Sequence, residues 1–426
     1  FKQKTAYEIR LSLVGSEMCI RDRNIMYKVK DAKNILFGNV NQLPVVKRNV
    51  TDCLGYTLSE NIYSPVDIPL FNNSAVDGFA VNCRNINLNE EFISFLITGE
   101  IKAGDNAFTF NKLKNNSAVY IYTGAAIPVN TSYVVMQEFV NIKNGYVIIS
   151  ADSLKKAGNI RLKASQIKKG KLALSKGHII NAASIGFLCS MGIIKIKVIY
   201  KPVVSVISTG NELQKPGEKL LPGHIFESNS FMLEAALKQS GYRTVEVKSV
   251  EDISKIIFNN IKIMLAASDV VIITGGISVG KYDLVKEILL RLGVTELFYK
   301  VSQKPGKPLY AGKYKNKFVF ALPGNPAASL VCFYEYVLPA LNKMSGHKEF
   351  GLKKELLPLT DSYEVKGDRD LFLKAKLLNG KVTILEGQES FILKSFTEAN
   401  AIVYFTSGNR IIKKGSLVET HLLPLI

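Results

Sequence analysis

The sequence predicts a multi-domain protein of the α/β plus β class, because three parts of the chain have different hydrophobic patterns. Between residues 202 and 345, apolar strands alternate with helices of ten or more residues, which is typical of a parallel sheet with helices on both faces. Residues 50–148 instead hold short β-rich runs separated by Asn, Gly and Pro, and short strands return after Gly346. We therefore expect a β-rich inserted domain over 50–148, an α/β domain over 201–347 and a C-terminal β-barrel or sandwich over 348–426.

The N-terminal segments complete this plan. The spacing of apolar residues over 29–40 predicts a helix with Asp31 as its cap. We assign residues 24–49 and 149–200 to one mixed, elongated domain. Residues 1–23 join poorly to the rest of the chain and lack the plan of a signal peptide, so we expect them to be a foreign, non-native leader.

The composition is that of a globular protein in a reducing compartment. Of the 426 residues, 47% are hydrophobic and 21% charged, so no part is strongly disordered. The five cysteines occur singly and there are only four histidines, so no cluster has metal-ligand spacing. We expect a cytoplasmic protein in which any metal is a hard cation held by carboxylates and substrate oxygens.

Charge and hydropathy limit the kinds of partner. The longest uncharged stretch, 318–334, has 17 residues and contains Pro323-Gly-Asn-Pro, so we expect no membrane span. The net charge of +19 favours anionic partners, or non-specific binding to polyanions. No basic-aromatic signature of a nucleic-acid module accompanies it, so we expect no specific nucleic-acid partner.

Three glycine-containing bends end strands of the predicted α/β domain. They read STGNE at 208–212, TGGISVG at 274–280 and LPGNP at 322–326. The carboxyl ends of parallel strands converge, and glycines there let the backbone approach a ligand and expose amide groups beside a helix N-terminus. The expected guest is phosphate or another oxyanion. The candidate binding residues are Thr209, Gly210, Gly275, Gly276, Ser278, Gly280, Pro323, Gly324 and Asn325.

Two alternatives remain for these bends. Taken singly, each is equally typical of an ordinary tight turn; three at successive strand ends favour a binding site. Neither the P-loop nor the dinucleotide fingerprint fits, because the Gly-Lys-Ser/Thr ending and the dinucleotide spacing are both missing. A different phosphate pocket is therefore predicted.

Three lysines lie in the segment YKVSQKPGKPLYAG. They are Lys300, Lys304 and Lys307, and the prolines at 305 and 308 stiffen the backbone between them. Lysines held in this way can neutralise a phosphate or a small tetrahedral oxyanion. We predict that Lys307 binds substrate and that the other two contribute to catalysis.

Carboxylates accompany the same strand ends. Glu212, Asp252 and Asp283 follow or flank them, and Mg²⁺ is bound by one or two carboxylates together with phosphate oxygens. Each could equally cap a helix. We predict that the three hold Mg²⁺ and act in catalysis.

With these residues in view, the chain resembles the molybdopterin molybdenumtransferase family, which includes MoeA and the C-terminal region of gephyrin. The resemblance runs from about Met26 to the end of the chain. Its motifs are DIPLFNNSAVDGFAV at 67–81, IYTGAAIP at 121–128, VVMQE at 134–138, STGNEL at 208–213, TGGISVGKYD at 274–283, KPGKP at 304–308 and LPGNPAAS at 322–329.

The resemblance implies a four-part molecule, normally a homodimer, whose α/β part is similar to the molybdopterin-adenylyltransferase fold. Family members place molybdenum from molybdate on the dithiolene of adenylylated molybdopterin and release AMP with the help of Mg²⁺. A molybdopterin adenylyltransferase and molybdoenzymes are the partners that this implies. The positions matching the family's functional residues are Asp77, Glu212, Asp252, Asp283, Lys300, Lys304 and Lys307.

The resemblance also implies a role for Asp77 and two further positions. Asp77 would approach the cleft of the partner subunit, although from sequence alone it is equally a turn aspartate before Gly78. Arg369 and Ser390 fall where the family places a molybdate-binding arginine and serine.

The chain also departs from the family pattern. Gln166 stands where an acidic residue is usual, and Asn72, Asn211 and Glu227 replace common aspartates. An amide still forms hydrogen bonds but carries no charge for a metal. A non-catalytic molybdopterin-binding or scaffold protein of the same fold is therefore the alternative to an active transferase.

Overall fold

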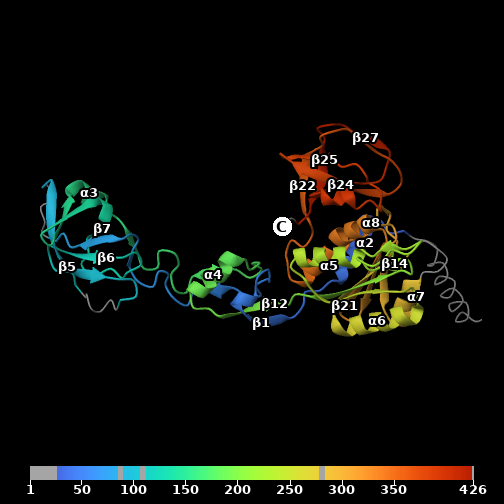
Figure 1. The fold of residues 1–426 in the computed structure, drawn as a ribbon, viewed down its shortest axis with the longest axis horizontal. Coiled ribbons are helices and arrows are strands. Elements are labelled where there is room, and N and C mark those ends of the chain that lie inside the picture. Colours follow the sequence, from blue (N-terminus) through green and yellow to red (C-terminus); the bar gives the residue numbers. More distant parts are fainter. Residues whose placement is uncertain (1–25, 85–89, 106–111, 278–283, 425–426) are drawn as a thin grey trace, which may run out of the picture. The chain divides into compact units, whose positions relative to one another are not determined.

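The computed structural model describes residues 26–84, 90–105, 112–277 and 284–424 (Figure 1). The chain divides into two compact units. The larger comprises residues up to 46, residues 55–57 and residues from 198 onward, and the smaller comprises 47–54 and 58–197. This division is coarser than the plan of four domains, which stays a prediction.

The smaller unit is built on a six-stranded sheet of order β7-β4-β6-β5-β9-β8, in which only β5 and β6 pair in parallel. One buried cluster, around Phe79 and Phe95, and a second, around Ala80 and Val119, follow the alternation of side chains along its strands. Its elements are η1 (Val50–Asp52), β2 (Ile62–Tyr63), β3 (Asn73–Ser74), β4 (Gly78–Val81), β5 (Phe92–Ile101), β6 (Ser117–Ile121), β7 (Tyr133–Met136), η3 (Gln137–Phe139), β8 (Val140–Lys143), β9 (Tyr146–Ser150), α3 (Ala151–Lys156), β10 (Ile160–Arg161), β11 (Leu172–Leu174) and α4 (Ala182–Ser190). The chain passes between the units in β1 (Val45–Asn49) and β12 (Lys195–Ile199), which pair with each other.

The larger unit contains a second six-stranded sheet, of order β16-β13-β17-β21-β20-β18. Its α/β part comprises α2 (Val29–Asn39), β13 (Val203–Thr209), β14 (Leu213–Gln214), β15 (Ile225–Phe226), α5 (Asn229–Gln239), β16 (Arg243–Val250), α6 (Ser254–Ala267), β17 (Val270–Thr274), α7 (Leu284–Arg291), β18 (Thr295–Tyr299), β19 (Gln303–Lys304), β20 (Tyr310–Tyr314), β21 (Lys317–Leu322), α8 (Pro326–Cys332), the π-helical turn η4 (Phe333–Val337) and α9 (Leu338–Met344).

Helices cover both faces of this sheet, as the continuous apolar strands predict (Figure 1). Val206, Ile272 and Phe320 point to one face and pack in a cluster with residues of α2, α5, α8 and α9. Ile207 and Ile273 point to the other face and pack against α6 and α7. The carboxyl ends of the central strands are thereby fixed in one rigid layer.

Two details of the sequence prediction are wrong. The strands β16, β13, β17 and β21 are parallel, but β20 and β18 are antiparallel. The reason is local: a two-residue turn at 315–316, with Lys315 at φ +55°, joins β20 directly to β21 as a hairpin. In α2 the residue before the helix is Lys28, and Asp31 lies in the first turn rather than at the cap.

The C-terminal β part forms a sheet of order β19-β24-β26-β28-β22, in which β25 also pairs with β24. It comprises β22 (Lys353–Pro358), β23 (Tyr363–Val365), β24 (Asp370–Leu378), β25 (Lys381–Ile384), η5 (Lys394–Thr397), β26 (Ala401–Phe405), β27 (Arg410–Ile412) and β28 (Leu417–Leu422). Strand β19 belongs to the α/β part, so this pairing ties the two parts of the larger unit together. In the described segments, no helix has both the length and the apolar character that a membrane crossing requires.

Candidate functional site

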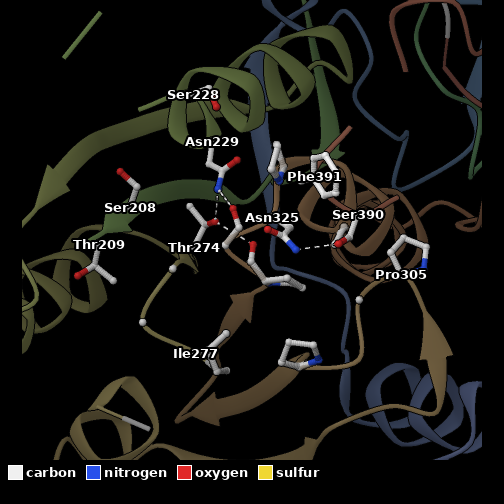
Figure 2. Close-up of a pocket in the computed structure, with 18 of the residues that line it drawn as sticks. Ser208, Thr209, Ser228, Asn229, Thr274, Ile277, Pro305, Asn325, Ser390 and Phe391 are labelled. Atoms are coloured by element: carbon white, nitrogen blue, oxygen red, sulfur yellow. Dashed lines mark hydrogen bonds between the residues drawn. The ribbon is translucent and has the colours of Figure 1, made fainter. Parts of the chain in front are cut away.

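A cavity of about 1110 Å³ lies in the larger unit, at the carboxyl ends of β13, β17 and β21 (Figure 2). Two groups of residues line it. We name the bends at 208–213, 274–277 and 323–326 the strand-end wall. The loop wall consists of the lysine loop, residues 304–308, together with Arg369 and the C-terminal segment 388–391.

The three bends of the strand-end wall lie against one another. A Cβ added at Gly275, which has φ +85°, would lie 2.1 Å from the carbonyl oxygen of Thr209, and one added at Gly324 would lie 3.7 Å from the Cα of Gly275. One added at Gly276 would lie 2.7 Å from a methyl carbon of Val285. Gly275 therefore permits close contact between two of the bends. The cavity lining includes the predicted residues Thr209, Gly275, Gly276, Pro323, Gly324 and Asn325, but not Gly210.

The expectation that glycine amides at these bends are exposed is wrong for Gly210. Its N–H donates to the carbonyl oxygen of Val250 at 3.2 Å, in continuation of the strand pairing. Side chains instead supply polar groups at this bend. The hydroxyl of Thr209 donates to the carboxylate of Asp252, and the backbone N–H of Asp252 donates to Asn211 Oδ1 at 2.9 Å.

A third polar group joins the bends at 274 and 324. Asn229, the first residue of α5, donates from Nδ2 to Thr274 Oγ1 at 3.0 Å and to the Gly324 carbonyl at 2.7 Å (Figure 2). Thr274 donates in turn to the Pro323 carbonyl at 3.2 Å. The sequence prediction missed Asn229, because nothing in the residues preceding α5 indicates that this helix begins at the cavity.

Two buried oxygens of the cavity lining have no hydrogen-bond partner among the described residues. They are Asn229 Oδ1 and the hydroxyl of Ser208, a residue that is only 1% exposed. Unpaired buried polar atoms are rare in folded proteins. Both residues line the cavity, so their unpaired oxygens lie close to it.

The lysine loop brings two of the three predicted lysines to the cavity. Lys304 and Lys307 line it together with Pro305, Gly306 and Pro308. Lys300 does not line it; its Nζ lies 4.8 Å from the centroid of the Tyr299 ring. Stiff prolines alone do not determine which of the lysines reach the cavity. The pairing of β19 with β24 also directs the lysine loop toward it.

The C-terminal domain supplies the rest of the loop wall. Arg369, Gln388, Ser390 and Phe391 line the cavity, so the structure places both residues of the molybdate prediction there. The Ser390 hydroxyl accepts from Asn325 Nδ2 at 2.7 Å, and its carbonyl accepts from the N–H groups of Ala327 at 3.1 Å and Ala328 at 3.3 Å. These bonds hold the segment against the bend at 323–326.

A buried lysine organises this C-terminal segment. Lys374 is 2% exposed, and its Nζ donates to the carbonyl oxygens of Gly387 at 2.5 Å, Ile392 at 2.9 Å and Glu389 at 3.4 Å. Burial lowers the pKa of this ammonium group below its ordinary value. No sequence signal separates Lys374 from the many exposed lysines of the chain.

The carboxylates divide between the described and undescribed parts of the chain. Glu212 and Asp252 line the cavity. Ser278, Gly280 and Asp283 lie outside the described residues. Among the residues that the structure describes, no group of three His, Cys, Asp or Glu side chains could hold a metal. Glu212 and Asp252 together fit a hard cation that takes two carboxylates and completes its coordination shell with substrate phosphate oxygens.

Besides Asn211, two further departures from the family pattern have hydrogen-bond partners. Asn72 Oδ1 accepts from the Lys163 N–H at 2.7 Å in the smaller unit. Glu227, which is 3% exposed at the edge of the cavity, accepts from the N–H of Ser230 at 2.8 Å and from its hydroxyl at 2.7 Å. Each therefore serves the local backbone.

Asp77 lies in the smaller unit, at a turn before β4. Its carboxylate accepts from the Thr123 N–H at 2.6 Å and from the Thr123 hydroxyl at 2.8 Å. These hydrogen bonds, the backbone one first, lower the pKa of Asp77. Asp77 thus remains ionised at neutral pH, and its contacts agree with a turn aspartate.

Two family models match the chain. Residues 27–192 match the MoeA N-terminal region (domain I and II), and residues 205–343 match a probable molybdopterin binding domain. The matches meet near residue 200, where the strand and helix pattern of the chain changes.

Relatives match over nearly the whole length. The chain is 33% identical over 401 residues to a molybdopterin molybdenumtransferase of Staphylococcus epidermidis, covering 92% of this chain and 95% of the relative. It is 35% identical over 420 residues to one of a Nostoc species, covering 94% of each. Its structure is similar to that of a molybdopterin biosynthesis MoeA protein from Pyrococcus horikoshii, with a TM-score of 0.73, 29% identity and coverage of 94% of this chain and 99% of that one.

Proposed function

This chain belongs to the MoeA family of molybdopterin molybdenumtransferases, and from that premise we propose that it inserts molybdenum into adenylylated molybdopterin in the cavity described above. The substrates are adenylylated molybdopterin and molybdate, and the products are molybdenum cofactor and AMP. Mg²⁺ assists the reaction. The protein is thus a transferase of molybdenum cofactor biosynthesis.

One observation supports this proposal most strongly. Two lysines, the carboxylates of Glu212 and Asp252, and two residues with unpaired buried oxygens line the same cavity at the carboxyl ends of three parallel strands. Lysine ammonium groups match phosphate and molybdate oxygens, whereas carboxylates match a divalent cation. Both kinds of charge are required where an anion with several phosphates is bound together with a metal.

The roles of the residues are inferred from their positions. Lys304 and Lys307 bind and orient the anionic groups of the substrate, and Arg369 and Ser390, which belong to the same loop wall, bind molybdate. Glu212 and Asp252 would hold Mg²⁺, and Thr209 keeps the Asp252 carboxylate in place through its hydroxyl. When bound, Mg²⁺ would neutralise charge on the phosphate oxygens as AMP leaves.

The test is an assay of AMP release and molybdenum incorporation, in a metal-free preparation with and without added Mg²⁺. Activity should appear only with Mg²⁺, and Lys304→Ala and Glu212→Gln should each reduce kcat/KM by roughly 100-fold or more, a typical effect of losing an electrostatic contact to the transition state. Lys262→Ala, an exposed lysine of α6, is the matched control and should leave activity unchanged. Binding of substrate without AMP release would instead favour a scaffold protein.

A homodimer is part of this proposal, with Asp77 acting in the cavity of the partner subunit. The Asp77 carboxylate is ionised and its unit is separate from the one that contains the cavity. Mixing Asp77→Asn and Glu212→Gln subunits tests the arrangement. If the aspartate acts across the dimer, random mixing of two inactive variants restores about a quarter of wild-type activity, because half the dimers then contain one complete site. If confirmed mixed dimers show no recovery of activity, Asp77 does not act across the dimer and serves only the turn of its own subunit.

We expect the protein to act in the cytoplasm. A molybdopterin adenylyltransferase would supply the adenylylated substrate, and molybdoenzymes would receive the product. Co-purification of the tagged chain with either class of protein is the corresponding measurement.

A further inference from the structure

The lysine loop rests on one buried side chain, Gln303. Gln303 and Lys304 form the two-residue strand β19, and successive residues of a strand point to opposite sides. Gln303 is accordingly fully buried, whereas Lys304 is exposed at the cavity. The residue that precedes the loop therefore lies beneath it.

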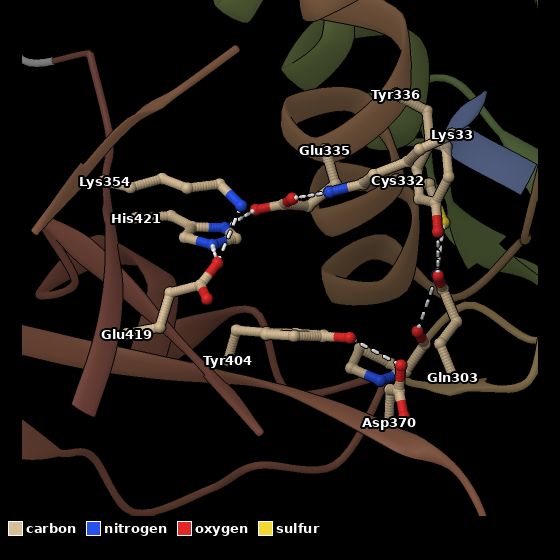
Figure 3. Close-up of polar contacts among 11 residues, drawn as sticks. Lys33, Gln303, Cys332, Glu335, Tyr336, Lys354, Asp370, Tyr404, Glu419 and His421 are labelled. Carbon is tan, nitrogen blue, oxygen red and sulfur yellow. Dashed lines mark hydrogen bonds and ion pairs between the residues drawn. The ribbon is translucent and has the colours of Figure 1, made fainter. Parts of the chain in front are cut away.

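The amide of Gln303 bonds directly to the backbone of the loop. Its Nε2 donates to the carbonyl oxygens of Pro305 at 3.1 Å and Gly306 at 3.3 Å. Its Oε1 accepts from the hydroxyl of Tyr336 at 2.5 Å (Figure 3). The two carbonyls can only accept, so the NH₂ group must face them and the amide oxygen must face Tyr336.

Packing fixes the loop on the same support. Gly306 has φ +93°, and a Cβ added there would lie 2.5 Å from Cys332 Sγ and 2.7 Å from Gln303 Nε2. No larger residue fits between the loop and these two side chains. The loop backbone is therefore in direct contact with Gln303, while Lys304 and Lys307 project to the cavity.

Tyr336 is itself rigidly held. It lies, fully buried, in the π-helical turn η4, next to Glu335. Glu335 binds Lys33 Nζ at 2.5 Å and His421 Nδ1 at 2.6 Å, which ties the turn to α2 and to β28 (Figure 3). Short π-helical turns such as η4 are frequent at functional sites in other proteins. The hydroxyl that orients Gln303 is thus part of a buried polar network, not of a mobile surface.

We propose that Gln303 is a positioning residue: oriented by Tyr336, its amide fixes the backbone of residues 305–306 and so aims Lys304 and Lys307 at the anionic groups bound in the cavity. This role rests on the proposed function for the identity of the anions. Gln303 does not touch substrate. Its effect is on how well the two ammonium groups are placed before the ligand arrives.

Gln303→Met and Tyr336→Phe test the proposal in the full-length chain. Gln303→Met keeps the length of the side chain and removes both hydrogen-bonding groups; Tyr336→Phe removes only the hydroxyl that orients the amide. Tyr334→Phe is the matched control, because it removes the same atom from a buried tyrosine of the same turn. Gln239→Met, on the exposed side of α5, controls for the amide.

Three quantities are measured: the Kd for AMP and for molybdate by calorimetry, KM and kcat for AMP release, and hydrogen exchange of residues 303–309. We expect Gln303→Met to weaken both ligands about tenfold and to raise KM more than it lowers kcat. Exchange should increase in the loop but not in β13 or β17. Tyr336→Phe should shift the same quantities in the same direction by less, and both control variants should match wild type.

Unchanged affinity and unchanged loop exchange in Gln303→Met would overturn the proposal, as would an equal effect of Tyr334→Phe. If Gln303→Met does not fold, Tyr336→Phe decides, since it retains the ring and its packing. If the wild type binds neither AMP nor molybdate, the proposed function fails, and loop exchange alone then shows whether Gln303 holds the loop.

Discussion

The two walls of the cavity are built in different ways. The strand-end wall is shaped by backbone contact: Gly275 lies so close to the Thr209 carbonyl that no Cβ fits between them, and Gly324 lies beside Gly275 at ordinary contact distance. The loop wall is shaped by buried side chains, Gln303 under the lysine loop and Lys374 under the segment 387–392, which bind loop carbonyls that have no strand to pair with. The shape of the strand-end wall therefore depends on a glycine that has no side chain, whereas the shape of the loop wall depends on two buried polar side chains.

This difference predicts how each wall fails. Steric contact between backbones cannot relax without moving strands, so replacing Gly275, the glycine in this contact, should disrupt the carboxyl end of the central strands. Removing a buried polar anchor leaves the sheet intact and frees only the loop. The free energy of unfolding should therefore change most when backbone contact in the strand-end wall is disturbed. In the mildest substitutions, only the affinity for the ligand should change.

The largest effect is expected for Gly275→Ala. The new Cβ meets the Thr209 carbonyl at 2.1 Å and forces an alanine to φ +85°. Left-handed strain and overpacking together should lower the free energy of unfolding of the larger unit by about 4 kcal/mol. Urea denaturation followed by circular dichroism measures this change.

Gly293→Ala is the control for backbone strain. Gly293 has a similar φ of +82°, but a Cβ there meets nothing within 4 Å. Its substitution should cost only about 1 kcal/mol. If the two variants were equally stable, the close contact of the bends would not be what shapes the strand-end wall.

Lys374→Met tests the loop wall. It removes the ammonium donor from the carbonyls of Gly387, Glu389 and Ile392, of which the first and last keep only the Ser395 hydroxyl as a donor among the described residues. Losing these charge-assisted hydrogen bonds should cost about 3 kcal/mol in total. The segment carrying Ser390 should then exchange its amide hydrogens faster and molybdate should bind more weakly. Calorimetry and hydrogen exchange measure these two changes.

Lys376→Met is the matched control, because Lys376 lies two residues further along β24 with its side chain exposed. It should change neither quantity. A loop that stays protected in Lys374→Met would show that Ser390's bonds to α8 hold it without help.

The strand-end wall can be predicted from the sequence because its signal is local. A buried apolar strand with a glycine after it predicts a bend at the carboxyl end, and parallel strands bring such bends together, so the sequence groups residues 209, 275 and 324 correctly around one cavity. The hairpin of β20 and β21 escapes prediction because a Lys-Asn turn at 315–316 carries a weaker signal than a glycine turn.

The loop wall cannot be predicted in the same way. Nothing local separates Gln303 or Lys374 from exposed residues of the same type. Gln303 is buried against Cys332 and Tyr336, and Lys374 beneath the segment 387–392, so the burial of each depends on parts of the chain that are not its sequence neighbours. Arg369 and Ser390 are indicated by family resemblance alone, and the structure places both at the cavity. Lys300, which the same resemblance groups with the other lysines, lies against Tyr299 instead.

A smaller effect, of a different kind, is expected for Glu335→Gln. Burial alone would raise the pKa of Glu335, but Lys33 and His421 outweigh it and lower the pKa to about 2, against an ordinary value of 4.5. The folded pKa lies below the unfolded one, so the ionised carboxylate stabilises the fold above about pH 4.5, and this contribution is lost as the pH falls toward 2.

Glu335→Gln should therefore lower the free energy of unfolding by on the order of 2 kcal/mol at pH 7, and the difference from wild type should shrink toward pH 2. Urea denaturation across this pH range measures it, with the exposed Glu398→Gln as control. A difference that stayed constant with pH would show that the network beneath the loop wall is not held by the charge of Glu335.

The smallest effect on stability is expected for Ser208→Ala, and it separates binding from folding most cleanly. Ser208 and Ser205 both lie in β13, both are buried, and neither hydroxyl has a hydrogen-bond partner among the described residues. Only Ser208 lines the cavity.

Removing either unpaired hydroxyl loses no internal bond, so the free energy of unfolding of each alanine variant should lie within about 1 kcal/mol of wild type. Because Ser208 but not Ser205 lines the cavity, we expect Ser208→Ala to weaken AMP or molybdate binding by up to about tenfold, measured by calorimetry, and Ser205→Ala to leave it unchanged. Equal affinities in the two variants would mean that the Ser208 hydroxyl is unpaired for a reason unrelated to the ligand.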